Sequence, residues 1–267
     1  MTTSTEPTVV IGSDMDLRDR YEHIMGRVAD AARSAGRRPE EIHVVLVSKY
    51  GTMEQIRELI DLGHRHFGES RVQQLDERAG QVREWIERRQ KSGVQADGAL
   101  NPDEIRWHMV GHLQRNKVKK AVKSARLFHG VDSLRLAEEI QSIAARRDEP
   151  IEMLLQVNTS GERQKHGISP PAVRHLVDQI DTMINVSVRG LMCMAENTTD
   201  ESRVRLAFDR CSELFTEIRS SGSGGEDFDI LSMGMSGDFE TAIRCGSNCV
   251  RIGSAVFANE GREAEAD

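Results

Sequence analysis

The sequence lacks the features that would place it in a membrane or secreted class. It has no apolar run of about 18 residues, the length that a transmembrane helix needs. Its first residues do not form a basic segment followed by an apolar stretch, so we expect no secretory signal. The net charge of −7 gives no general attraction to nucleic acid or to anionic lipid. DNA and membranes are therefore not expected as partners.

Cysteine is scarce and has no pairing pattern. The sequence contains no Cys-x-x-Cys motif and no spacing typical of a disulfide framework or a zinc site. We therefore expect reduced thiols in a cytoplasmic protein, and no bound metal. His108 and His112 are four residues apart, but a strand end and a glycine separate them rather than a helical turn, so we expect structural or pocket-lining roles for them. The four cysteines are Cys193, Cys211, Cys245 and Cys249.

What the sequence does contain is a regular alternation of short apolar runs with helical stretches. Strands that alternate with helices imply a parallel sheet. Eight such units in about 250 residues fit one closed barrel, so we expect a single (β/α)8 TIM barrel, with a doubly wound open sheet as the runner-up. A further helix is expected over 16–35, before the first strand. The expected strands are 43–48, 64–67, 106–110, 127–131, 152–157, 186–192, 230–233 and 249–252.

The domain organisation follows from the same pattern. We expect a flexible N-terminal lead over 1–15, a barrel over 16–258 and a flexible C-terminal tail over 259–267. Exposed insertions are expected over 91–104 and 220–227, where polar and small residues gather. A monomer is the expected state, because no further domain follows the barrel to build a dimer.

Lys49 ends the first expected strand, in the run V-V-L-V-S-K. Active sites of TIM barrels lie at the carboxyl ends of the strands, and burying an ammonium group there is costly without a partner. Two interpretations stay open. Lys49 could extend its charged end into solvent. It could instead be a desolvated amine that attacks the carbonyl carbon of an aldehyde or ketone.

Small residues follow the seventh and eighth expected strands, in S-M-G-M-S-G and V-R-I-G-S. Loops at these places in a TIM barrel recurrently bind phosphate, because small residues let backbone N–H groups approach an anion. Tight turns also favour such residues. Combined with the strand-end lysine, they indicate a phosphorylated carbonyl ligand, either pyridoxal 5′-phosphate (PLP) or a sugar phosphate held as in a class I aldolase. The candidates are Ser232, Gly234, Ser236, Gly253 and Ser254.

Arg251 lies between these small residues and helps to choose the ligand. It could donate to a phosphate or to a pyridine nitrogen, or form a salt bridge at the barrel rim. An arginine has no acceptor and stays protonated, so it would keep a facing ring nitrogen unprotonated. The electron-withdrawing power of a pyridoxal ring would then be weak.

The motifs of the chain resemble those of a known family, the YggS/PROSC type of PLP-binding, or PLP homeostasis, proteins. The resemblance covers the chain from about Asp16 to Phe257. Many blocks occur in the same order, which makes chance agreement very rare. They are V-S-K at 47–49, F-G-E at 67–69, W-H-M-V-G-H-L-Q-R-N-K at 107–117, H-G-V-D-S at 129–133, V-N-T-S at 157–160, K-H-G at 165–167, R-G-L-M at 189–192, and the two glycine- and serine-containing runs already quoted.

The resemblance implies a barrel similar to the N-terminal domain of alanine racemase, with PLP as the cofactor. By that match Lys49 would hold PLP as an internal aldimine and Arg251 would face the pyridine nitrogen. The phosphate would be contacted by Ser232, Gly253 and Ser254. The sequence departs from the family at Ser70, where asparagine is common, which puts an inherited contact at this position in doubt. It also departs at Arg115, which we expect on the surface.

Three functions remain in competition. The resemblance implies a non-catalytic PLP carrier, which buffers the cofactor or delivers it to PLP-dependent apoenzymes. The alternative is a PLP-dependent amino-acid racemase or decarboxylase. Racemases of this type use a tyrosine from a C-terminal domain opposite the lysine, whereas this chain has only Tyr21 and Tyr50, and ten residues follow Phe257. We therefore expect no efficient catalysis. An aldolase that forms a Schiff base without PLP ranks third, since such enzymes more often carry the lysine on a later strand.

Overall fold

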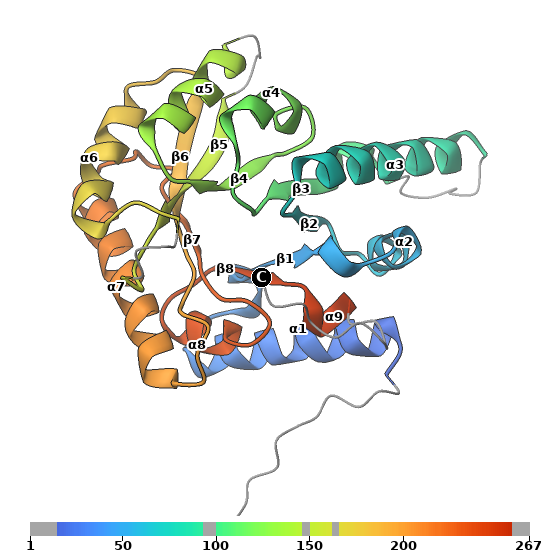
Figure 1. The fold of residues 1–267 in the computed structure, drawn as a ribbon. Coiled ribbons are helices and arrows are strands. Elements are labelled where there is room, and N and C mark those ends of the chain that lie inside the picture. The colour runs from blue at the N-terminus through green and yellow to red at the C-terminus, as the bar shows by residue number, and fades with distance from the viewer. Residues whose placement is uncertain (1–14, 93–99, 146–149, 162–165, 258–267) are drawn as a thin grey trace, which may run out of the picture.

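The computed structural model describes residues 15–92, 100–145, 150–161 and 166–257. Their centre is a closed barrel of parallel strands in the order β1 to β8, which confirms the expected TIM barrel (Figure 1). The runner-up, an open sheet, is wrong because β1 pairs with β8, from His43 opposite Cys249 to Leu46 opposite Ile252. The strands are β1 His43–Val47, β2 His66–Glu69, β3 Arg106–Met109, β4 Leu127–Val131, β5 Ile151–Val157, β6 Val186–Cys193, β7 Ile230–Ser232 and β8 Cys249–Ile252.

Helices surround this barrel (Figure 1). The first helix precedes β1 and contacts the last two helices, so the start and the end of the barrel lie side by side. Arg20 Nε donates to the carbonyl of Val256 at 2.9 Å, and Arg27 pairs with Glu240. The helices are α1 Leu17–Ser34, α2 Met53–Asp61, α3 Val72–Lys91, α4 Val118–Ala121, α5 Leu134–Ala144, α6 Pro170–Asp181, α7 Glu201–Ser220, α8 Phe239–Arg244 and α9 Ser254–Phe257.

Helix starts follow local capping chemistry. Asp16 accepts the N–H of Asp19 at the start of α1, which supplies a partner to one of the unpaired amides of the first turn. Thr52 and Gln55 form a reciprocal capping box at the start of α2, immediately after the segment that carries Lys49. The sequence therefore fixes where the chain leaves β1 and enters α2, which positions the lysine.

The barrel has a large apolar layer outside the strands and a more polar interior. Successive residues of a strand point to opposite faces, so Phe67 and Trp107 pack outward against the helices, while their neighbours His66 and His108 point inward. Trp107 is buried in that outer core, as expected for packing. A smaller cluster of Leu127, Leu154 and Met192 is separate from it. The inward polar residues matter below because they lie under the candidate site.

The remaining expectations concern the ends, the insertions and the cysteines. The expected lead and tail fall outside the described residues, apart from Met15. The insertion expected over 91–104 is described only in part, and that over 220–227 forms mostly exposed turns. All four cysteines are buried free thiols. Among the described residues, no helix is long and apolar enough to cross a membrane.

Candidate cofactor site

A cavity of about 520 Å³ opens at the carboxyl ends of the strands. Lys49, Arg251, Gly253 and Ser254 all line it, so the structure brings together four of the five residues that the family resemblance assigns to the cofactor. Its volume falls within the range of about 300–1,000 Å³ typical of ligand pockets. Ser70, the departure from the family pattern, lines it as well.

Lys49 lies in a short 3-10 segment, η2 Ser48–Tyr50, directly after β1. It is partly buried, and its Nζ lies 4.8 Å from the centre of the Tyr50 ring, which provides a cation–π contact. Lys49 therefore lines the cavity, and its amine lies beside an aromatic ring.

A buried ion pair holds the segment that carries Lys49. Arg78 of α3 donates to the carbonyl of Ser48, and its Nη2 donates to the carbonyl of Gly51 at 2.9 Å. These two carbonyls flank the lysine in sequence. One guanidinium therefore fixes the backbone on both sides of Lys49, and we call this contact set the Arg78 clamp.

The clamp includes a carboxylate at the end of β2. Glu69 is fully buried; its Oε1 lies 2.5 Å from Arg78 Nη1 and 2.5 Å from the hydroxyl of Ser48. Its Oε2 has no hydrogen-bond partner among the described residues. Burial raises the pKa of Glu69, and the contacts to Ser48 and Arg78 oppose that rise. Removing the arginine would therefore leave a carboxylate in an apolar setting.

The loops after β7 and β8 meet at the wall of the cavity that adjoins β1. Ser236 lines the cavity, and its hydroxyl accepts the N–H of Gly253 at 3.1 Å and that of Ala255 at 3.4 Å. A Cβ atom added to Gly253 would lie 3.0 Å from the carbonyl oxygen of Val47, so a side chain there would have to push that carbonyl back by a few tenths of an ångström. This part of the wall is therefore formed by backbone and small side chains, as an approaching anion would need.

Arg251 is 4% exposed and forms the floor of the cavity. Its Nη1 donates to the carbonyl of Ser232 at 3.0 Å and to its hydroxyl at 2.6 Å, and Nη2 donates to the carbonyl of Cys193 at 3.1 Å. Desolvation lowers the pKa of Arg251. All three acceptors are neutral, so the guanidinium keeps its positive charge for whatever occupies the cavity.

Ser232 is placed differently from the other predicted residues. It is fully buried, it is absent from the lining of the cavity, and its hydroxyl lies 3.0 Å from His129 Nδ1 as well as against Arg251. Its hydroxyl therefore serves the arginine beneath the cavity, and the structure does not present it to a phosphate.

His112, Asp132 and His166 form a cluster at the cavity, which both histidines line. The Nδ1 atoms lie 3.4 and 3.7 Å from Asp132 Oδ2, and the two rings stack with centroids 4.1 Å apart and planes at 15°. One ligand atom of each of the three residues lies within 4.8 Å of the others, which is close enough for a group that could hold a metal ion.

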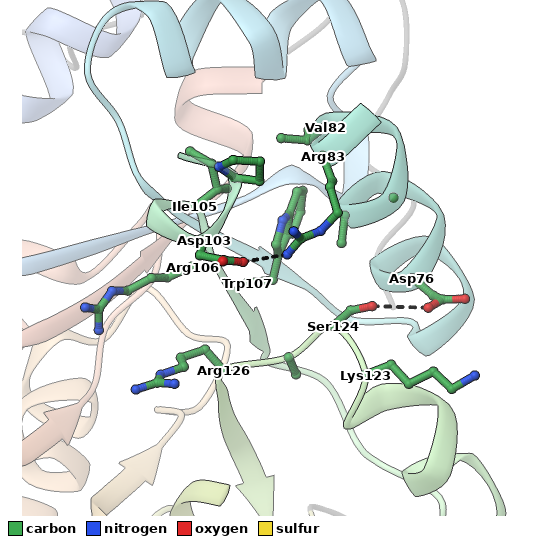
Figure 2. Close-up of a pocket in the computed structure, with 14 residues that line it drawn as sticks. Asp76, Val82, Arg83, Asp103, Ile105, Arg106, Trp107, Lys123, Ser124 and Arg126 are labelled. Atoms are coloured by element: carbon green, nitrogen blue, oxygen red, sulfur yellow. Dashed lines mark hydrogen bonds and ion pairs between the residues drawn. The ribbon is translucent and has the colours of Figure 1, made fainter. Parts of the chain in front are cut away.

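A second hollow, of about 590 Å³, lies at the opposite end of the barrel (Figure 2). It lies beside the starts of β3 and β4, and the residues that line it include four basic ones, Arg83, Arg106, Lys123 and Arg126. Arg83 pairs with Asp103 at 2.6 Å, and Arg126 Nε lies 3.8 Å from Glu152. Much of the positive charge is thus compensated within the chain, and the hollow is remote from Lys49.

Sequence reasoning did not find several residues of the site. Gln156 and Met194, at the ends of β5 and β6, line the cavity without belonging to a recognisable pattern. Glu69 was quoted only as part of F-G-E, although a glutamate at the end of a buried strand is itself a sign of a buried partner. Arg78 carries no such sign, because it lies within a helix that is rich in arginine.

Comparisons with known proteins agree with this geometry. Residues 19–260 match the family model described as alanine racemase, N-terminal domain. A pyridoxal phosphate homeostasis protein of Vibrio cholerae is 32% identical over 241 residues, which is 90% of this chain and 95% of that protein.

Two solved structures are also similar. A protein of Bifidobacterium adolescentis, described as unknown, is 32% identical with a TM-score of 0.80, over 90% of this chain and 94% of the other. PipY of Synechococcus elongatus, solved with PLP bound, is 28% identical with a TM-score of 0.68, over 86% of this chain and 100% of the other. The chain therefore belongs to the family of the pyridoxal phosphate homeostasis proteins, which share the barrel of the alanine racemase N-terminal domain.

Proposed function

We propose that this protein binds PLP in the cavity at Lys49 and acts in PLP homeostasis, buffering the cofactor or delivering it to apoenzymes. The observation that carries the proposal is the meeting of a lysine amine, a buried arginine and a wall of small residues in one cavity of about 520 Å³. The homeostasis proteins at about 32% identity and the PLP-bound structure of PipY support it.

The residues present fit the three chemical parts of PLP. Lys49 offers the amine that would hold the aldehyde covalently. Arg251 would face the ring nitrogen, and Gly253, Ser254 and Ser236 would hold the phosphate. Ser232, which the sequence placed at the phosphate, is assigned here to orienting Arg251.

We further infer that the protein has no robust catalytic activity. PLP supplies an electron-withdrawing ring when bound, and a permanently charged arginine at the ring nitrogen keeps that effect weak. Tyr21 donates or accepts at His64 on the outer side of the barrel, 3.4 Å away, and Tyr50 is a neighbour of the lysine itself. Neither tyrosine lies where a second base opposite Lys49 would stand.

One observation favours the second candidate, a weak racemase or decarboxylase. His112 and His166 line the same cavity as Lys49, so groups able to exchange a proton are present. Exchange of the α-proton of amino acids in D₂O, followed by NMR, tests this. Exchange that depends on Lys49 and is lost in His112→Gln or His166→Gln would favour the enzyme over the carrier.

The proposal is tested by absorption spectroscopy of the purified protein with PLP, before and after borohydride, followed by peptide mass mapping. We expect an absorption band in the violet region that borohydride abolishes, with the pyridoxyl mass on Lys49. Lys49→Ala should remove the label, and Lys91→Ala, a lysine at the end of α3, should not. A wild-type protein that stays colourless with PLP contradicts the proposal and brings the sugar-phosphate alternative forward.

Delivery is tested separately, by mixing the loaded protein with a PLP-dependent apoenzyme. Activation of that enzyme at a rate above spontaneous PLP release would support transfer through direct contact. Bound PLP that neither amino acids nor an apoenzyme can withdraw over hours would contradict a carrier role. The monomeric state and the cytoplasmic location stay predictions, for which size-exclusion chromatography with light scattering and cell fractionation are the measurements.

A further inference from the structure

A row of imidazoles runs through the interior of the barrel beneath the cavity. His66 Nδ1 lies 3.1 Å from His108 Nε2, and His108 Nδ1 lies 3.0 Å from His129 Nε2. His129 Nδ1 in turn lies 3.0 Å from the hydroxyl of Ser232, which accepts from Arg251 at 2.6 Å. The row therefore ends on the arginine that forms the floor of the cavity. We call His66, His108 and His129 the histidine row.

Burial keeps this row uncharged. His108 and His129 are 5% and 0% exposed, and desolvation lowers the pKa of both well below the ordinary value. The charge of Arg251 lowers the pKa of His129 further. Burial also lowers the pKa of His66 to about 4. At neutral pH each ring thus has one N–H donor and one acceptor nitrogen.

The hydrogen-bond capacities of the end groups favour one direction for the row. Arg251 has donors only, so the hydroxyl of Ser232 accepts from it. The single proton of that hydroxyl is then available to His129 Nδ1. With Nδ1 as acceptor, His129 carries its proton on Nε2 and donates to His108, which does the same toward His66. These protons are assigned from the network, in which every ring nitrogen between Ser232 and His66 then has a partner.

This arrangement bears on Arg251 because, among the described residues, its three hydrogen-bond acceptors are the carbonyl and hydroxyl of Ser232 and the carbonyl of Cys193, all of them neutral. Two of the three contacts are to Ser232, and one of these is to its hydroxyl, which His129 Nδ1 also contacts at 3.0 Å. A hydroxyl that is held by a buried ring gives the arginine one defined acceptor position.

We propose that His129, supported by His108, is a positioning residue for cofactor binding, which fixes the Ser232 hydroxyl and through it the orientation of Arg251 toward the ring nitrogen of PLP. The inference rests on the proposed function, because it requires PLP in this cavity. It predicts that a change at the histidine row alters how PLP is bound, although none of the three rings lines the cavity.

The experiment compares two substitutions at one position. His129→Leu removes both ring nitrogens, whereas His129→Asn keeps a polar group toward Ser232 and loses the contact with His108. Both remove the partner of His108 Nδ1 while His66 still pairs with Nε2, so both should lower the thermal midpoint of the PLP-free protein to a similar extent. PLP binding should separate them. We expect the Kd for PLP to rise at least about tenfold in His129→Leu, with a shifted absorption maximum, and to stay near wild type in His129→Asn.

A third variant keeps the inference testable if the His129→Leu protein does not fold. Ser232→Ala removes only one hydroxyl, and it should weaken PLP binding in the same direction as His129→Leu. Imidazole ¹⁵N NMR of the PLP-free wild type adds a readout without cofactor, and should show neutral rings protonated on Nε2 at His108 and His129.

The outcomes separate the inference from the proposed function. If wild type does not bind PLP, the proposed function fails and the inference fails with it. If wild type binds PLP and both His129→Leu and Ser232→Ala bind with unchanged Kd and spectrum, the inference alone fails. A folded His129→Asn protein that loses PLP as strongly as the leucine variant would also overturn it, because the contact to Ser232 would then not be what matters.

Discussion

The Arg78 clamp makes a quantitative prediction about stability. Arg78→Met removes the partner of Glu69, whose side chain is fully buried, and the donor to the carbonyls of Ser48 and Gly51. Breaking a buried ion pair by removing one partner leaves an uncompensated charge, which costs about 3–5 kcal/mol. We expect the free energy of unfolding to fall by that amount. Replacing Glu69 by Met in the same protein should restore much of the loss, because no charge is then left buried.

The measurement is urea unfolding of the PLP-free protein, followed by circular dichroism. Arg83→Met is the matched control, since Arg83 lies on the same helix and pairs with Asp103 at 2.6 Å, but with side chains 53% and 72% exposed. An exposed pair contributes at most about 1 kcal/mol. If Arg78→Met costs no more than Arg83→Met, or if the two losses at Arg78 and Glu69 simply add, the reasoning is refuted.

The same double variant separates stability from site geometry. Arg78→Met with Glu69→Met still leaves the carbonyls on either side of Lys49 without their donor. PLP affinity should therefore stay reduced even where stability has recovered. Recovery of both together would mean that the clamp does not position the lysine.

Two further predictions concern stability alone. Gly190→Ala should destabilise the protein by at least about 3 kcal/mol in thermal or urea unfolding, because φ is +146° and the new Cβ would lie 1.8 Å from the carbonyl oxygen of Ile230. Gly26→Ala should instead stabilise the protein by about 0.5–1 kcal/mol, because this glycine lies within α1 and has open space around it. Lowering the pH from 6.5 to 4 should reduce the free energy of unfolding by up to about 3 kcal/mol through His64, which is 6% exposed and whose pKa burial lowers to about 4. As the pH falls, the unfolded chain binds a proton at His64 near the ordinary pKa of 6.5, whereas the folded protein binds it only near pH 4. The contribution of His64 to stability is therefore complete above pH 6.5 and is lost as the pH falls toward 4. A free energy of unfolding that does not change across this pH range, in wild type and in His64→Phe alike, would contradict this prediction.

The strands were predictable because their chemistry is local. β4 and β8 occur at the expected residues 127–131 and 249–252, since a short, mostly apolar run between helical stretches has few other ways to be buried. Boundaries differ where a neighbouring element decides them: β2 begins at His66 rather than at residue 64, because the backbone N–H of His64 still donates to the carbonyl of Leu59 at the end of α2. The four-residue helix α9 was not foreseen, because so short a segment is set by its packing against α1.

The residues of the site also differ in how far the sequence could predict them. Lys49, Arg251 and Gly253 could be named because strand ends of a barrel are adjacent by topology, whatever the loops do. The Arg78 clamp and the histidine row could not, since they depend on which side chains meet across the interior. Ser232 shows the limit: its place at the end of β7 was foreseen, but alternation along the strand turns its hydroxyl to the barrel axis rather than to the cavity.

The seam between β1 and β8 has a consequence for biosynthesis. Lys49 follows the first strand of the barrel and Arg251 lies on the last, and the two strands pair with each other. A nascent chain emerging from the ribosome would carry Lys49 early, but the wall of the cavity that includes Arg251 and Gly253 would be missing until β8 and the loop after it had been translated. Competence to bind the cofactor would therefore arise in one step, at the closure of the ring. A truncated or incompletely folded chain would not sequester PLP, so the cofactor itself can report on whether the barrel has closed.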